Sequence, residues 1–179
     1  MTEFPLPRAV WGVALEQFVG PGMVAPAFGV DGRSSDYDLF REAPWELAPA
    51  WTSPDGRHAV HLVADADWEP PTSVLLETEG GTCVGFYAGG ELWIDEDRRG
   101  AGLSTPLILC LVARLGKATY DTRSGLGFSP AGYAAHAAAH RIAVERAVAA
   151  GMRVPAEVRA EAASRSVPAA SYSGAPRRT

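Results

Sequence analysis

The sequence is poor in lysine, in cysteine and in long apolar runs. Lys117 is the one lysine among sixteen basic residues, and twenty-one acidic residues bring the net charge to −5. No cluster of arginines forms a basic footprint, which argues against a nucleic-acid-binding protein. No stretch approaches the length of a membrane span, and the first residues lack the apolar core of a signal peptide. These absences predict a cytoplasmic protein that makes no membrane contact.

Metal and disulfide chemistry also find little support. Cys83 and Cys110 both lie among apolar neighbours, which is typical of small core residues and not of a disulfide framework. His58 and His61 stand three positions apart and would face opposite sides of a regular strand. No cysteine or carboxylate accompanies them at metal-ligand spacing, so we expect no metal site.

A chain of 179 residues that is 47% hydrophobic is sufficient for one domain. We place this domain at 1–163 and expect a flexible polar tail at 164–179. Runs of alternating apolar residues predict four strands, at 58–64, 73–78, 82–87 and 91–95. Glycine-containing breaks of hairpin length separate the last three, which should therefore form an antiparallel meander.

Helical patterns surround these strands on both sides in the sequence. Early in the chain we expect short helices at 9–18 and 36–42, and a leucine-lined helix follows the fourth strand. The C-terminal part, 129–163, is helical, with an alanine-rich helix beginning near Ser129 and Pro130 and a shorter one at 156–164. The expected fold class is α/β in the broad sense (α+β), with a mainly antiparallel sheet flanked by helices.

The strand, turn and helix at 91–116 form the central feature of the sequence. Gly100 and Gly102 permit backbone conformations closed to other residues and allow a ligand close to the main chain. The helix that follows leaves its first N–H groups facing the turn, where they and the helix dipole favour an anion. Ser104 adds a hydroxyl, and Arg99 adds charged donors. A purely structural strand-to-helix turn is the open alternative, because glycine turns occur in many α/β proteins.

The same turn resembles the signature of the GNAT superfamily of acyl-CoA-dependent N-acyltransferases. The matching residues are Arg99, Gly100, Ala101, Gly102, Leu103 and Ser104, preceded by the strand residues Leu92, Trp93, Ile94, Asp95 and Glu96. The resemblance implies transfer of an acetyl or other acyl group from acyl-CoA to an amine of a small molecule or peptide. It also implies that backbone N–H groups at 99–104 hold the coenzyme A pyrophosphate and that the strand edge at Leu92, Trp93 and Ile94 pairs with the pantetheine arm.

The sequence departs from that family after the leucine-lined helix. The family places another strand there, whereas this chain offers at most a stub at 118–120, and Arg123 stands where the family has a tyrosine that can act as general acid. A fourth strand left unpaired invites pairing with another chain. Three alternatives therefore stay open: a catalyst, a non-catalytic module that binds acyl-CoA, a nucleotide or a protein partner, and a homodimer that completes the sheet.

Candidate catalytic groups lie on the fourth strand and on the alanine-rich helix. We take Glu91 or His140 as the general base and Tyr133 as the acid that protonates the leaving sulfur. Tyr133, His136 and His140 share one stripe of the helix with apolar neighbours. The open alternative for both histidines is that they pack at a helix interface and bond backbone carbonyls. Their spacing also resembles a zinc pair, but the glutamate and third ligand of such a site are missing.

Overall fold

The computed structural model describes residues 4–19, 48–63, 71–88, 91–117 and 128–165. Within these ranges the chain is mixed α/β, with one five-stranded antiparallel sheet in the order β1-β2-β3-β4-β5. The strands are β1 (Trp51–Thr52), β2 (His58–Leu62), β3 (Thr72–Glu77), β4 (Cys83–Ala88) and β5 (Glu91–Ile94). The predicted meander is confirmed, since β3, β4 and β5 pair in sequence order. The sequence did not predict β1, a two-residue edge strand that begins with the buried Trp51.

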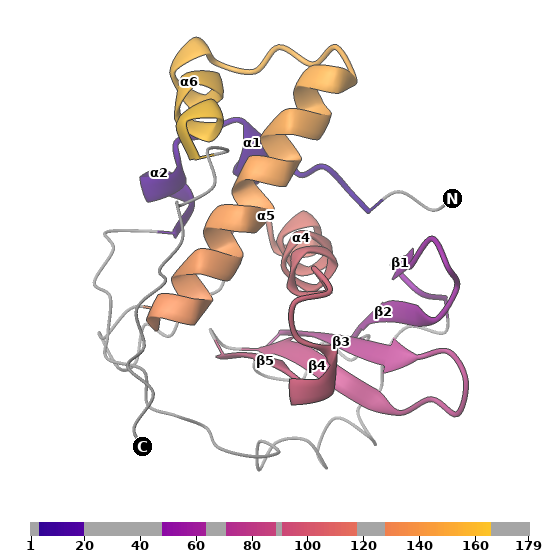
Figure 1. Ribbon diagram of the computed structural model, residues 1–179. Coiled ribbons are helices and arrows are strands. Elements are labelled where there is room, and N and C mark those ends of the chain that lie inside the picture. The colour runs from indigo at the N-terminus through magenta and orange to yellow at the C-terminus, as the bar shows by residue number, and fades with distance from the viewer. Residues whose placement is uncertain (1–3, 20–47, 64–70, 89–90, 118–127, 166–179) are drawn as a thin grey trace, which may run out of the picture.

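Helices cover one face of this sheet in two layers (Figure 1). The first layer is α4 (Ser104–Leu115), which packs on β2, β3 and β4. The second is α5 (Pro130–Ala149), which crosses α4 and also carries α6 (Ala156–Arg165). Ser129 caps α5 by accepting a hydrogen bond from the Gly132 N–H at 3.1 Å, which confirms the predicted start of this helix.

The main core lies between the helices and the sheet. Leu107, Ile108 and Leu111 of α4 are fully buried there against Val60 and Leu75 of the sheet. The opposite face of the sheet carries a second buried cluster, in which the rings of Phe86 and Trp93 stack with centroids 5.7 Å apart. Because β3 and β4 have buried residues on both faces, apolar and polar residues alternate less regularly along them than along the strands of a sheet with one exposed face.

The helix expected at 9–18 is wrong as a single element. The chain forms α1 (Arg8–Trp11) and α2 (Leu15–Val19), separated at Gly12. The break leaves the carbonyl of Val13 free to accept from His140 Nε2 at 2.8 Å. It also lets the Leu15 N–H donate to a carboxylate oxygen of Glu161 at 2.9 Å, so a residue of α6 caps α2. These two bonds to distant residues replace the helical bonds that a continuous helix would make.

Several expectations fall outside the described residues. These are the helix at 36–42, the strand stub at 118–120 and Arg123. Most of the tail at 164–179 lies outside them too, although Ser164 and Arg165 belong to the last turn of α6, so the helix is longer than expected. Within the described ranges, none of the helices combines the length and the apolar character needed to cross a bilayer.

Candidate functional site

β5 is the last strand of the sheet in the described part of the chain, and some of its backbone N–H and C=O groups point outward, away from β4. The Asp95 N–H donates to the Val84 carbonyl at 2.9 Å, and the register then pairs Trp93 with Phe86. Residues of an antiparallel pair alternate between inward-bonded and outward-directed backbone groups. The N–H and C=O groups of Leu92 and Ile94 therefore point away from β4, at the edge where the resemblance to the GNAT superfamily implies a paired pantetheine arm.

The turn after β5 is short and tightly organised. Asp95 caps a single 3₁₀ turn, η1 (Glu96–Arg98), by accepting a hydrogen bond from the Asp97 N–H at 3.1 Å. Gly100 and Gly102 then take positive φ angles of 79° and 74°, which explains why the sequence has glycine at both positions. Both glycines and Ala101 are exposed, and a Cβ atom added at either glycine would meet no atom of the described residues within 4 Å. The backbone of this turn is therefore open to a ligand.

The N-terminus of α4 follows this turn directly. Leu103 occupies the N-cap position, and its side chain makes no hydrogen bond to the first backbone N–H groups of the helix. The Thr105 N–H donates to the Gly102 carbonyl at 3.2 Å, and Pro106 has no N–H to offer. Ser104, which is half-buried, retains a backbone N–H and a hydroxyl as donors at this helix start.

The two arginines of the turn have different partners. Arg98 donates through Nη2 and Nε to one carboxylate oxygen of Glu77, at 2.7 and 3.0 Å, and this contact raises the pKa of Arg98. Arg99 donates through Nε to the Ile94 carbonyl at 3.0 Å. Arg99 was expected to offer its guanidinium to an anion, but one of its donors is already bound to β5. No sequence pattern indicates this bond.

The three candidate catalytic residues do not form one cluster. Glu91 is half-buried on β5, and strand alternation places it on the same face as Trp93, away from the helices. Tyr133 is half-buried in the first turns of α5 and packs against the core on the helical side. The sheet therefore separates the candidate acid from the candidate base on β5.

His140 is fully buried, packs between helices and bonds a backbone carbonyl, which was the alternative to a catalytic role. Its Nε2 donates to the Val13 carbonyl, which requires the proton on that nitrogen. Its Nδ1 is buried and has no hydrogen-bond partner in the described part of the chain. Burial lowers the pKa of His140, while the Val13 carbonyl and Glu161 act in the opposite direction. Protonation at Nδ1 would place an unpaired charge inside the protein, which argues against His140 as an accessible base.

A second histidine forms a buried pair that the sequence did not reveal. The Tyr87 hydroxyl lies 2.7 Å from His136 Nε2, and both side chains are fully buried. His136 Nδ1 lies 2.7 Å from the Gly132 carbonyl, which can only accept, so Nδ1 carries the proton and Tyr87 donates to Nε2. The imidazole sits against the ring of Phe128, with centroids 4.1 Å apart, and burial lowers its pKa to about 4.

Sequence reasoning placed His136 on the buried stripe of α5 but did not single out Tyr87. A tyrosine at a core-facing strand position usually bonds a partner through its hydroxyl, which was a usable signal. The identity of that partner, 49 residues away, depends on how α5 crosses the sheet. Local pattern carries no information on such a crossing.

The cysteines and the surface contribute little to a site. Burial raises the pKa of Cys83 to about 11 and that of Cys110 to about 12, so both thiols stay protonated and unreactive at neutral pH.

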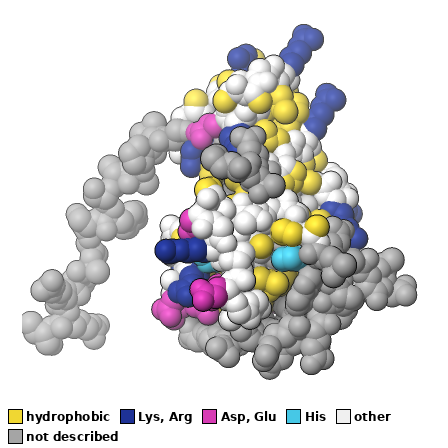
Figure 2. All heavy atoms as spheres, turned by 90° about the vertical axis from the view of Figure 1, so that its right-hand side faces the viewer, with side chains coloured by type: hydrophobic (Ala, Val, Ile, Leu, Met, Phe, Trp, Pro, Cys, Tyr) yellow, Lys and Arg dark blue, Asp and Glu magenta, His cyan; other side chains and the backbone are white. Residues whose placement is uncertain are grey.

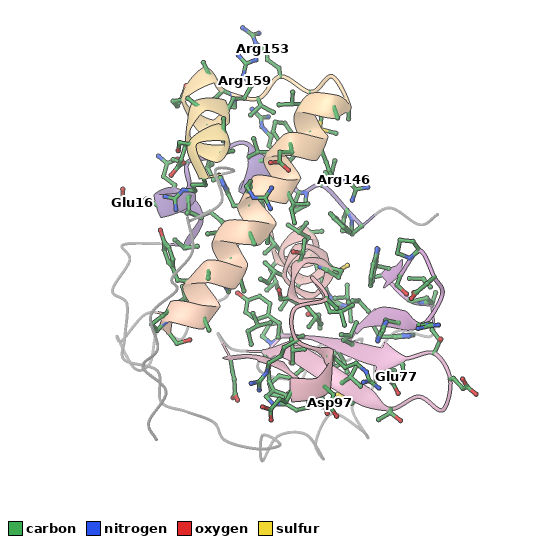
Figure 3. The ribbon with its side chains drawn as sticks, viewed as in Figure 1. Glu16, Glu77, Asp97, Arg146, Arg153 and Arg159 are labelled. Atoms are coloured by element: carbon green, nitrogen blue, oxygen red, sulfur yellow. The ribbon has the colours of Figure 1, made fainter. Side chains whose placement is uncertain are left out.

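Arg153 and Arg159 project from the end of the helical layers that lies far from the sheet (Figure 3). On the face seen in Figure 2, basic side chains stand at that end, while acidic and basic side chains lie together near the sheet.

Comparisons with protein-family models, curated proteins and solved structures found no match for this chain.

Proposed function

We propose that this protein binds acyl-CoA at the turn 99–104 and transfers the acyl group to an amine. The observation that carries the proposal is the open backbone between β5 and α4. Two exposed glycines with positive φ stand beside a helix start without a side-chain cap, and a Cβ added at either glycine would meet no atom of the described residues within 4 Å. Backbone N–H groups and the positive end of a helix dipole favour a diphosphate at such a place.

The edge of β5 supports the second half of the proposed site. Leu92 and Ile94 direct backbone donors and acceptors outward, and an extended pantetheine arm with its amide groups can pair with them as an added strand does. The order of elements supports the same assignment, because an antiparallel meander leads through a glycine turn into the helix that covers the sheet. This is the order of the central elements in the GNAT superfamily, which the turn resembles.

The proposed reaction is direct acyl transfer. The amine nitrogen attacks the thioester carbonyl carbon, the C–S bond breaks, a base takes a proton from nitrogen, and the leaving sulfur takes a proton. The outward N–H of Ile94 is the proposed donor to the carbonyl oxygen as negative charge develops there. Glu91 stays the proposed base, and the burial of His140 leaves it a weaker candidate for base. Tyr133 is the proposed acid, and its place on the other side of the sheet from Glu91 makes it the weaker of these two assignments.

Binding at the turn is tested by calorimetry with coenzyme A on two valine variants. Gly102→Val forces a β-branched residue to a positive φ at the start of α4, so the turn must change shape and coenzyme A affinity should fall about tenfold or more. Gly116→Val is the matched control, because Gly116 has φ 73° at the other end of the same helix and a Cβ added there would also meet no described atom within 4 Å. An equal loss of affinity in both variants would contradict a site at the turn.

Turnover is tested separately, by thiol release from acetyl-CoA with a panel of amines. We expect Glu91→Gln and Tyr133→Phe each to lower kcat with little change in coenzyme A affinity, because each removes a proton-transfer group and leaves the turn intact. Unchanged turnover in the double variant would remove both residues from the mechanism.

A second candidate is a non-catalytic module that binds acyl-CoA, a nucleotide or a protein partner. It is favoured by the separation of Glu91 and Tyr133 to opposite sides of the sheet. Coenzyme A binding without thiol release would support a ligand-binding module. Absence of binding, together with a dimer in light scattering, would instead favour pairing of two chains through the β5 edge.

A further inference from the structure

The outer edge of β5 is partly occupied by a side chain of the same protein. The Ile94 carbonyl points outward, and it accepts a hydrogen bond from Arg99 Nε at 3.0 Å. An added strand or an extended ligand that pairs with this edge needs the same carbonyl as an acceptor. Arg99 therefore competes for a group that the proposed co-substrate would use.

We infer that Arg99 gates the edge of β5 and selects acyl carriers that bear a diphosphate. In the arrangement described here its guanidinium occupies the Ile94 carbonyl, and a diphosphate bound at the turn draws the guanidinium away and opens the edge to the arm. This inference rests on the proposed acyl-CoA site and adds to it a reason for discrimination against pantetheine, which has the same amide-bearing arm but lacks the nucleotide diphosphate.

The exchange is favourable because the two acceptors differ in charge. A guanidinium bonds a neutral carbonyl through one donor in the exposed arrangement seen here, whereas a diphosphate accepts two parallel charge-assisted bonds from the same group. Arg99 is exposed, so its side chain can swing without leaving a cavity. Gly100, which follows it directly, is exposed and has no side chain that could obstruct the movement.

The neighbouring arginine cannot take this role. The Arg98 guanidinium is bound through two of its donors to Glu77 on β3. It therefore supplies positive charge near the turn without touching the edge of β5. Arg98→Ala removes the same formal charge as Arg99→Ala and is the matched control.

The test is calorimetric titration of the wild type, Arg99→Ala and Arg98→Ala with coenzyme A and with pantetheine. A gate predicts changes of opposite sign in Arg99→Ala: pantetheine binds about tenfold more tightly because the carbonyl is free, and coenzyme A binds about tenfold more weakly because the diphosphate loses its partner. Arg98→Ala should leave pantetheine affinity unchanged. A loss of affinity for both ligands by the same factor in Arg99→Ala would overturn the gate and show that Arg99 only holds the turn in shape.

The outcomes separate this inference from the proposal beneath it. If the wild type binds neither ligand, the acyl-CoA site itself is wrong and the gate falls with it. If the wild type binds coenzyme A but its preference over pantetheine is the same in Arg99→Ala, only the gate is wrong. Arg99→Lys, which retains the charge but not the planar donors, should show an intermediate preference, and thermal melting of each variant shows that it is folded.

Discussion

The turn after β5 and the buried face of α5 both contain groups able to transfer protons or bind charge. These groups are exposed at the turn and buried on α5. At 99–104 the backbone is exposed, two glycines have positive φ, and the helix start has no side-chain cap. Inside α5, His136 and His140 are fully buried and bonded to carbonyls of Gly132 and Val13. The first arrangement leaves polar groups available to a ligand, and the second commits them to the fold. Chemistry is therefore expected at the turn, and stability is expected to depend on the histidines.

The largest effect on stability is expected for His136→Ala. The substitution leaves a cavity beside Phe128 and removes the acceptor of the buried Tyr87 hydroxyl, at a combined cost of about 4 kcal/mol in the free energy of unfolding. Tyr87→Phe, which keeps the ring, should cost about 1 to 2 kcal/mol. Urea denaturation measures both, and the double variant should be less destabilised than the sum of the singles. Strict additivity would show that the two groups do not interact.

Acid should weaken the same interior by a similar amount. The unfolded chain takes up a proton at His136 near pH 6.5, whereas burial lowers the folded pKa to about 4, so the unfolded state binds more protons between these values. Stability should fall by about 3 kcal/mol as the pH decreases through this window, and His140 shifts in the same direction. Urea midpoints measured from pH 7 to pH 4 test this. A His136→Gln variant should show a smaller slope, and equal slopes would contradict the assignment.

At the turn we expect a moderate loss of stability and, unlike at the histidines, a change in coenzyme A binding. Gly102→Val and Gly116→Val should each lower the free energy of unfolding by about 2 kcal/mol, because both place a β-branched residue at positive φ in open space. Only the first should weaken coenzyme A binding. If Gly102→Val were far more destabilising than Gly116→Val, the turn would have a structural role that the exposed backbone does not show. Thermal melting of the two variants makes the comparison.

The smallest effect is expected on the exposed face of α5. Arg141 and Glu145 form an i, i+4 ion pair at 2.8 Å with both side chains partly exposed. Arg141→Ala should therefore cost only about 0.5 kcal/mol, and less in high salt. Because Arg141 lies on the same helix as His136, denaturation of both variants compares a buried and an exposed polar group directly. If Arg141→Ala lowered the free energy of unfolding nearly as much as His136→Ala, the exposed and buried faces of α5 would not differ in their contribution to stability.

Local pattern was sufficient to predict four of the five strands and the long helices. Alternation and glycine breaks located β2 to β5 within two residues at each end, and Ser129 with Pro130 located the start of α5. The buried stripe of α5 also followed from helical spacing, because His136, His140, Val144 and Ala147 are all buried. These features depend on neighbours in the sequence, which is why periodicity reveals them.

Contacts between distant segments could not be predicted in the same way. The break at Gly12 is explained by partners on α5 and α6, and the Tyr87 hydroxyl finds its acceptor on α5. The candidate turn was recognised from its glycines, but the bond from Arg99 to Ile94 depends on where a flexible side chain folds back. Tertiary geometry decides each of these, and no spacing rule encodes it.

The hydrogen bonds that hold the N-terminal helices have a consequence for the order in which the protein acquires its structure. The Val13 carbonyl and the Leu15 N–H find their partners 127 and 146 residues later, on α5 and α6. During synthesis β1 to β5 and α4 are complete long before those partners leave the ribosome. The first helices of the chain should therefore be among the last to dock, and a nascent chain halted before α6 should expose residues 8–19 to proteolysis.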